Sequence, residues 1–129
     1  MTPNTTTESQ DAKKQQSDQH LVELIKTVLD DAKSEDVVAI NIREKSSIAD
    51  YMVVASGRSN RHVGAIADQV SRAIRESGEP KPRVEGLNSM DWVLVDAGDV
   101  IVHIFRPEVR EFYNIEKMWS AEFTHENAH

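Results

Sequence analysis

The amino-acid sequence predicts an α/β protein, a single compact domain in which helices cover a mixed β-sheet. The first observation is size, because 129 residues with 39% hydrophobic content suffice for one ordinary domain and hardly for two. The second is that apolar residues at helical spacing alternate along the chain with short β-branched runs. The third is the segment from Trp92 to Phe105, where two such runs flank Asp-Ala-Gly-Asp, a sequence typical of a hairpin turn.

Both ends of the chain are polar and are expected to lie outside the domain. Residues 1–19 contain almost no apolar side chain, so burial cannot offset the entropy lost on ordering, and we predict a disordered polar tail. A flexible C-terminal tail is expected over 121–129. The domain itself is therefore predicted to span residues 20–120.

The first half of the domain is predicted to hold two helices and two strands. The first helix runs from about residue 20 to residue 33, where apolar residues recur at helical spacing: Leu21, Val22, Leu24, Ile25, Val28, Leu29 and Ala32. Apolar runs at 37–42 and 51–55 predict strands, the second apolar on both faces and therefore central. A second amphipathic helix is expected over about 60–77, with Ser59 or Asn60 as its N-cap.

The hairpin sorts its side chains into two unlike faces. A two-residue loop at Ala97 and Gly98 would pair Val95 with Val100, whereas a three-residue loop with a bulge at Gly98 would pair Val95 with Asp99. In the two-residue register, Leu94 pairs with Ile101 and Trp92 with His103. One face is then aliphatic, with Val93, Val95, Val100, Val102 and Ile104. The other, here called the mixed face, carries Trp92, Leu94, Asp96, Asp99, Ile101, His103 and Phe105.

The mixed face is too apolar to be simply solvated and too polar to be simply core, so we interpret it as a surface that docks another macromolecule. A final helix is expected from Pro107 to about Ser120, with an apolar stripe toward the sheet at Val109, Phe112, Ile115, Met118 and Trp119. Arg110 and Tyr113 lie off that stripe and are placed to reach the mixed face. The predicted partner-binding residues are Trp92, Leu94, Asp96, Ile101, His103, Phe105, Arg110 and Tyr113.

Composition narrows the class of partner. The net charge is −7, so a broad electrostatic contact with nucleic acid is disfavoured and a basic protein partner would be attracted. The sequence has no cysteine, and hence neither a disulfide framework nor a thiolate metal site. No apolar run resembles a signal peptide or a membrane span. We therefore expect a soluble, cytoplasmic protein with no membrane partner.

The turn from Ser56 to His62 is the place where an enzyme would carry its chemistry. It lacks the Gly-Lys-Ser/Thr ending of a P-loop, and Arg61 stands where a nucleophile elbow around Ser59 needs glycine. His62 and His103 also lack a metal-ligand spacing. We predict no catalytic residue, cofactor or metal. A nucleotide-binding or nucleotidyltransferase-type enzyme using Gly57 and Ser59 is the alternative, and a homodimer formed through the mixed face is a third hypothesis.

The ordered combination of several motifs resembles the Iojap-like ribosomal silencing factors. The motifs are Ala49-Asp50-Tyr51, Ser56-Gly57-Arg58-Ser59-Asn60-Arg61-His62-Val63, Glu85-Gly86, Trp92-Val93-Leu94-Val95-Asp96, Gly98-Asp99-Val100, Val102-His103, Arg110-Glu111-Phe112-Tyr113 and Ile115-Glu116-Lys117-Met118-Trp119. The resemblance covers about residues 21–120. One departure is Met118, where the family often has leucine, and this change nearly conserves volume.

The resemblance implies a domain shaped like a nucleotidyltransferase but without its catalytic carboxylates. Members of the family bind the large ribosomal subunit through large-subunit ribosomal protein fourteen, and so block joining of the small subunit and lower translation. Organelle relatives assist biogenesis of the large subunit. Carried onto this chain, the resemblance implies a binding surface that includes Trp92, Leu94 and His103, with Arg110 and Tyr113 nearby.

Overall fold

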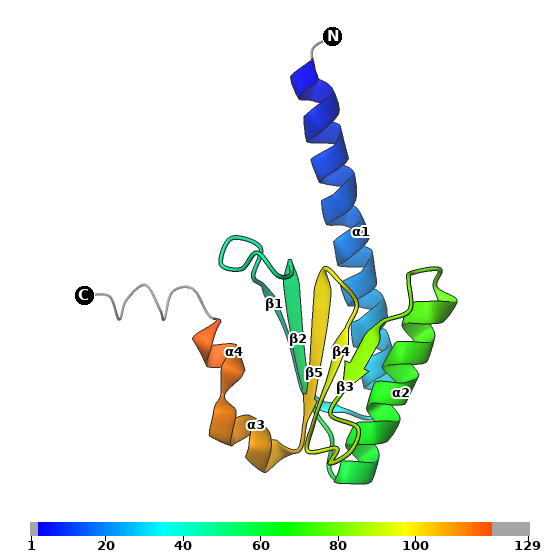
Figure 1. Cartoon of the computed structure of the whole chain (residues 1–129), viewed down its shortest axis with the longest axis vertical. Helices are drawn as coiled ribbons and strands as arrows, with labels where there is room; N and C mark the ends of the chain where they lie inside the picture. The colour runs from blue at the N-terminus through cyan, green and yellow to red at the C-terminus, as the bar shows by residue number, and fades with distance from the viewer. Residues whose placement is uncertain (1–2, 120–129) are drawn as a thin grey trace, which may run out of the picture.

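A computed structural model describes residues 3–119 and contains one five-stranded sheet with helices on both sides (Figure 1). The elements, in chain order, are α1 (Pro3–Asp31), β1 (Glu35–Asn41), β2 (Tyr51–Ser56), α2 (Asn60–Glu76), β3 (Arg83–Glu85), β4 (Trp92–Asp96), β5 (Val100–Phe105), α3 (Pro107–Tyr113) and α4 (Ile115–Met118). The strand order is β1-β2-β5-β4-β3. Strands β2 and β5 are parallel and the other neighbours are antiparallel, so the predicted mixed sheet is confirmed.

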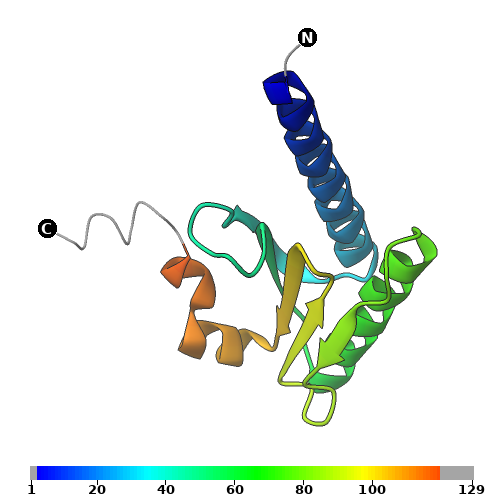
Figure 2. The same ribbon diagram turned by 45° about the horizontal axis from the view of Figure 1, so that its top comes forward.

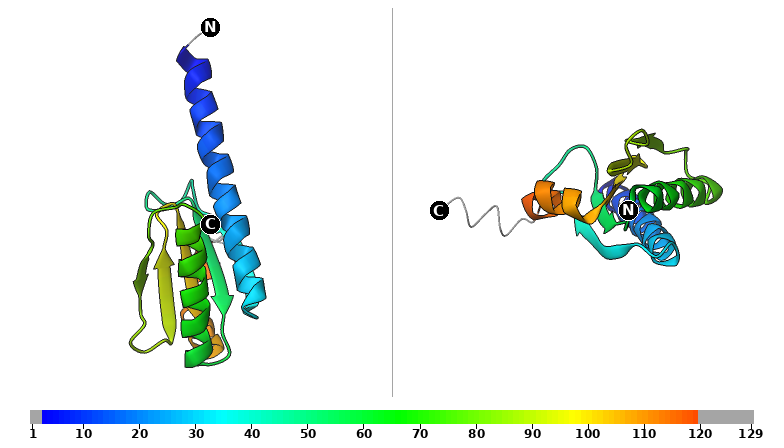
Figure 3. Two further views of the ribbon diagram at one scale, coloured as in Figure 1. Left: turned by 90° about the vertical axis from the view of Figure 1, so that its right-hand side faces the viewer. Right: turned by 90° about the horizontal axis from the view of Figure 1, so that it is seen from below.

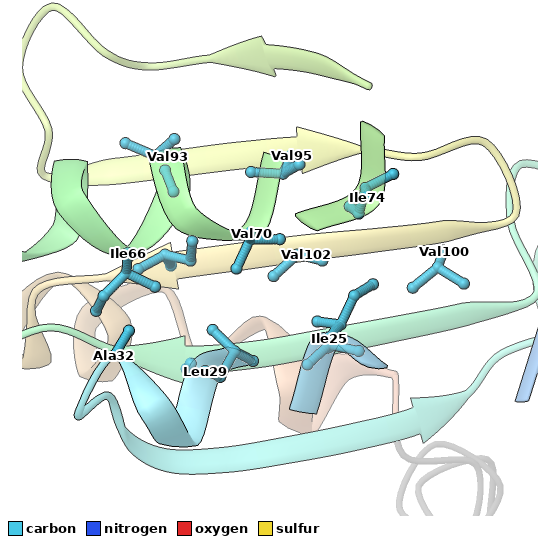
Figure 4. Packing of buried hydrophobic residues seen from close by; sticks show 14 of the residues in the cluster. Ile25, Leu29, Ala32, Ile66, Val70, Ile74, Val93, Val95, Val100 and Val102 are labelled. Atoms are coloured by element: carbon cyan, nitrogen blue, oxygen red, sulfur yellow. The ribbon is translucent and has the colours of Figure 1, made fainter. Parts of the chain in front are cut away.

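Helices α1 and α2 cover one face of the sheet, whereas α3 and α4 lie on the other (Figure 3). The larger core lies between the sheet and α1 and α2, and Figure 4 shows its side chains interdigitating. All five residues predicted for the aliphatic face of the hairpin are fully buried there: Val93, Val95, Val100, Val102 and Ile104. The sidedness of the hairpin is therefore confirmed.

A second, smaller core lies on the opposite face, beneath α3 and α4. Its buried side chains include Met52, Val54 and Phe105, with Trp92 and Ile101 partly buried at its edge. Strand β2 contributes to both cores because Val53 and Ala55 point to the larger one, as expected for the predicted central strand.

The register of the hairpin differs from both predictions. Asp96 pairs with Ile101, Leu94 with His103 and Trp92 with Phe105, so the loop is longer than either predicted loop. Two bonds stabilise it: Gly98 N–H donates to Asp96 Oδ1 at 2.9 Å, and the Ala97 N–H donates to the Val100 carbonyl at 2.9 Å. Relative to the predicted two-residue loop the pairing is offset by two residues, and an even offset leaves every side chain on its predicted face.

Helix α1 is longer than predicted and extends beyond the sheet (Figure 2). The expectation of a disordered tail over 1–19 therefore does not match the structure from Pro3 onward, while 121–129 lie outside the described residues. The predicted helix over 107–120 is also interrupted, because Asn114 adopts a left-handed conformation with φ of 48° between α3 and α4. Phe112, within α3, is 80% exposed and does not pack on the sheet as the predicted stripe requires.

A cluster of charges explains why α1 is ordered well before its apolar stripe begins. The Lys14 ammonium lies 2.7 Å from Asp50, 3.2 Å from Asp99 and 3.4 Å from the buried Asp18. Arg43 lies 3.2 Å from Asp18 and 3.1 Å from Asp50. Three carboxylates this close can hold a cation, and in this structure the side chains of Lys14 and Arg43 supply the positive charge. The polar segment thus gains ion pairs with the sheet, which sequence spacing did not indicate.

Within this cluster the pKa values of the Asp18 and Asp50 carboxyls are shifted in opposite directions. Burial, followed by the hydrogen bond with Asp50, raises the pKa of Asp18 to about 6 from its ordinary 3.8. The hydrogen bond from Asp18, followed by that from Lys14, lowers the pKa of Asp50. A hydrogen bond between the two carboxyls contributes to both shifts, in addition to the burial of Asp18 and the Lys14 ammonium beside Asp50.

None of the helices within residues 3–119 is both long and apolar enough to cross a membrane.

Replacing Asp18 by asparagine should change how stability depends on pH. An acid whose pKa is raised in the folded state contributes stability that is complete below its unfolded pKa and is lost as pH rises through about 6. An asparagine amide donates to Asp50 at every pH, so thermal denaturation should show Asp18→Asn gaining stability relative to wild type between about pH 5 and about pH 7.5. Asp18→Ala, which cannot donate a hydrogen bond to Asp50, should be less stable than Asp18→Asn at both ends of this pH range. A constant difference between Asp18→Asn and wild type would contradict the hydrogen bond between the two carboxyls.

Gly86 should tolerate no side chain, because it fixes the approach of β3 to β4. Its φ is +94°, and a Cβ there would lie 2.2 Å from the Trp92 carbonyl oxygen. Gly98 has a similar φ of +89° but open space around it, so Gly98→Ala isolates the conformational cost. Denaturant unfolding should show a loss of about 1 kcal/mol for Gly98→Ala and about 3 kcal/mol or more for Gly86→Ala, where overpacking adds to the strain. Equal losses would show that the close approach relaxes at no cost.

Candidate partner-binding site

An apolar groove of about 210 Å³ opens on the face of the sheet that α3 and α4 only partly cover. Strands β4 and β5 form its floor, and its walls are the loop between β1 and β2 and the segment around α4. The groove is lined by Ile42, Ser46, Ile48, Met52, Trp92, Leu94, Ile101, His103, Ile115 and Trp119. We refer to it below as the groove.

Trp92 connects the groove floor to the smaller core. Its ring centroid lies 4.8 Å from that of Phe105, 5.0 Å from Tyr113 and 5.9 Å from His103. The indole Nε1 donates a hydrogen bond of 3.0 Å to His103 Nδ1. Trp92 is only partly buried, so these contacts hold the indole in one orientation while part of it stays accessible in the groove.

His103 is uncharged in this environment. Burial lowers its pKa to about 4 from an ordinary 6.5, because the imidazolium form would lose hydration without gaining a carboxylate partner. The ring stacks at 12° to Phe105, with 6.0 Å between centroids. The groove therefore presents a neutral imidazole at neutral pH.

The structure brings four of the predicted partner-binding residues together in the groove: Trp92, Leu94, Ile101 and His103. Tyr113 stands beside them against Trp92 and is half-exposed. Asp96 is not among the lining residues; it accepts from the loop at Gly98 and faces Arg83 at 3.6 Å. Phe105 is fully buried beneath Trp92, so in this conformation it supports the groove and does not reach a partner.

Arg110 joins α3 to α4 and is not free to reach a partner. Its Nε and Nη2 donate to the Glu116 carboxylate at 2.9 Å each, and its Nη1 donates to Ser56 Oγ at 2.8 Å. The side chain is 11% exposed. Because this pair spans the break at Asn114, it sets the direction of α4 and thereby places Ile115 and Trp119 at the groove.

Sequence reasoning missed the wall formed by the loop between β1 and β2. Ile48, 74% exposed, lines the groove there, and Lys45 Nζ donates to the Trp119 carbonyl at 2.6 Å, which ties the loop to the end of α4. A single isoleucine after a polar turn carries little information, since isolated exposed apolar residues are common. The loop becomes meaningful only when the fold places it opposite β4 and β5.

The Gly57 and Ser59 turn makes contacts that anchor α2. Ser59, one of the two predicted candidates, is the N-cap, and its Oγ accepts from the His62 N–H at 3.1 Å. His62 Nδ1 accepts from the Arg58 N–H at 2.9 Å, and its Nε2 lies 2.9 Å from the Ala32 carbonyl at the end of α1. These bonds join α1, the turn and α2, and they lend no support to the alternative of a nucleotide-binding enzyme.

Fold and groove together define a small α/β domain that offers an apolar surface on one side of its sheet. The chain belongs to the family described as ribosomal silencing factor during starvation, whose model matches residues 14–129. The predicted family membership is therefore confirmed. Curated relatives from Zymomonas mobilis and Bacillus subtilis are named ribosomal silencing factors.

Relatives and solved structures agree with this assignment. A ribosomal silencing factor RsfS from Zymomonas mobilis is 50% identical over 99 residues, which cover 77% of this chain and 74% of that protein. A mouse protein named mitochondrial assembly of ribosomal large subunit protein 1 is 28% identical over 77% of this chain and 45% of its own length. A crystal structure of a protein from Chromobacterium violaceum matches with a TM-score of 0.76 and 40% identity, covering 78% of this chain and 84% of that one.

The hydrogen bonds from Arg110 to Glu116 and Ser56, here called the clamp, should be weakened even by a substitution that keeps the positive charge. Arg110→Lys can donate to one partner but cannot reproduce the planar contact with Glu116 together with the bond to Ser56. We expect a loss of about 1–3 kcal/mol in unfolding free energy and faster amide exchange over residues 115–119. The control is Arg72→Lys, because Arg72 is 55% exposed in its pair with Asp68 and such surface pairs contribute little. Exchange in 115–119 that is unchanged by Arg110→Lys would contradict the clamp.

Proposed function

We propose that this protein is a translational repressor that binds the large ribosomal subunit through large-subunit ribosomal protein fourteen and sterically blocks joining of the small subunit. The observation that carries the proposal is the groove, in which Trp92, Leu94 and His103 lie together on the paired strands β4 and β5. The family name and the ribosomal names of the relatives support a ribosomal partner. The protein would act in the cytoplasm, and the name of the mouse relative supports a further role in assembly of the large subunit.

The groove has the features of a protein-binding centre. An indole held on three sides by rings loses little conformational entropy when a partner covers it, and tryptophan is frequent among residues that dominate binding energy. Apolar side chains surround it on the floor and walls, which excludes water from the contact once a partner is seated. A standard interface of roughly 800 Å² on each partner would extend beyond the groove over Tyr113.

Repression by this route requires no chemical step. The domain would occupy a surface of the large subunit that the small subunit needs, so the two would compete for one place. The net charge of −7 favours approach to a basic ribosomal protein over direct contact with ribosomal RNA. A homodimer through the groove would compete with ribosome binding, so light scattering at rising concentration of the free protein checks for that competitor.

A charge introduced on the groove wall should abolish ribosome binding while leaving the fold intact. Ile48 is 74% exposed, so Ile48→Glu costs the free protein little, but a bound partner would bury the unpaired carboxylate. Co-sedimentation with large subunits should weaken at least about tenfold, and the block of subunit joining should weaken in parallel. The matched control is Leu87→Glu, since Leu87 is 51% exposed and does not line the groove. Equal binding by both variants and wild type would exclude the groove as the contact surface.

A further inference from the structure

The groove is neutral as well as apolar. None of its lining side chains is acidic or basic apart from His103, whose pKa of about 4 leaves the ring uncharged at neutral pH. A phosphate or an ammonium group placed there would lose its hydration without gaining an opposite charge. The chemistry of the lining therefore favours an uncharged occupant.

The hydrogen bond from Trp92 determines which nitrogen of His103 carries the proton. An indole Nε1–H is a donor and never an acceptor, so Nδ1 of His103, 3.0 Å away, must accept and be unprotonated. A neutral imidazole has one N–H, which is then on Nε2. The contact with Trp92 thus leaves His103 with one donor and no remaining acceptor.

That remaining donor is open to the groove. Within the part of the chain that the structure describes, every fully buried side-chain nitrogen or oxygen has a hydrogen-bond partner. Nε2 of His103 bonds to none of the described residues, so it is not fully buried and can be reached from the groove that the ring lines. The other polar groups of the lining are the Ser46 hydroxyl, whose Oγ accepts from the Ile48 N–H at 3.0 Å, and the indole N–H of Trp119.

The size of the groove suits a side chain more than a cofactor. Its volume of about 210 Å³ lies below the roughly 300–1,000 Å³ of pockets that enclose drug-sized ligands. An apolar side chain inserted beside Trp92 would bring its own main chain to the rim, and main-chain carbonyls are acceptors that need a donor when buried. A segment of protein therefore supplies both the apolar group and the acceptor that this groove lacks.

We propose that the groove binds a protein segment which inserts an apolar side chain against Trp92 and presents a main-chain carbonyl oxygen to the Nε2–H of His103. This assignment rests on the proposed function, because it names the chemistry of the segment that the groove takes from the large subunit. His103 thereby has two roles on opposite sides of its ring: it orients Trp92 through Nδ1 and recognises the partner through Nε2.

Two substitutions separate the roles. In His103→Asn the amide oxygen takes the position of Nδ1 and accepts from Trp92, while the outward donor is lost. In His103→Gln the amide nitrogen reaches the position of Nε2 and donates outward, while Trp92 loses its acceptor. We expect His103→Asn to weaken co-sedimentation with large subunits about tenfold or more, because a buried carbonyl is left unpaired, and His103→Gln to stay within about threefold of wild type. Thermal denaturation should rank the variants differently, with Asn closer to wild type than Gln.

The remaining outcomes each bear on the proposal. Wild-type binding by His103→Asn overturns it, and so does equal loss in both variants, which would indicate that ring shape matters and the donor does not. If either variant fails to fold, the imidazole ¹⁵N spectrum of the wild-type protein decides, since a proton on Nδ1 or a charged ring at neutral pH overturns the assignment. Binding to protein-depleted ribosomal RNA as tight as to the intact subunit would replace the protein segment with RNA. Failure of wild type to bind large subunits at all would remove the proposed function itself.

Discussion

Strand β5 lies at the centre of the sheet, and the alternation of its side chains sets both the core and the groove. It pairs in parallel with β2 on one side and antiparallel with β4 on the other. Val100, Val102 and Ile104 point toward α1 and α2 and are fully buried, whereas Ile101 and His103 point to the groove. A slip of one residue would bury the imidazole and expose the valines, so the main core holds the groove residues in place.

The groove exists because the second face of the sheet is covered by short helices. Helix α3 has seven residues and α4 has four, and the left-handed Asn114 turns the chain between them. The bonds from Arg110 to Glu116 and from Lys45 to the Trp119 carbonyl fix the position of α4. An apolar surface left open in this way, next to a well-packed core, is a feature of sites that are covered by another molecule.

Charge and apolar contact are separated on this protein. The net charge of −7 acts over long distances and governs which macromolecules approach, whereas the groove itself is neutral and governs what fits. The cluster around Asp18 illustrates a third use of charge, since its ion pairs hold the polar part of α1 against the ends of β2 and the hairpin. The strength of each of these charge effects depends on how far the groups lie from solvent as much as on residue type.

The sequence by itself determined where most helices and strands form and the sidedness of the hairpin, because the period of apolar residues depends only on local backbone geometry. It therefore predicted the buried valines, a helix cap at Ser59 or Asn60, and the gathering of Trp92, Leu94, Ile101 and His103 on one face. Only the tertiary structure decided contacts between residues far apart in the chain: the ordering of α1 by Asp50 and Arg43, the burial of Phe105, the use of Arg110 within the domain, and the wall formed by Ile48. Such contacts leave no periodic pattern in the sequence, because they depend on how whole helices and strands pack against one another.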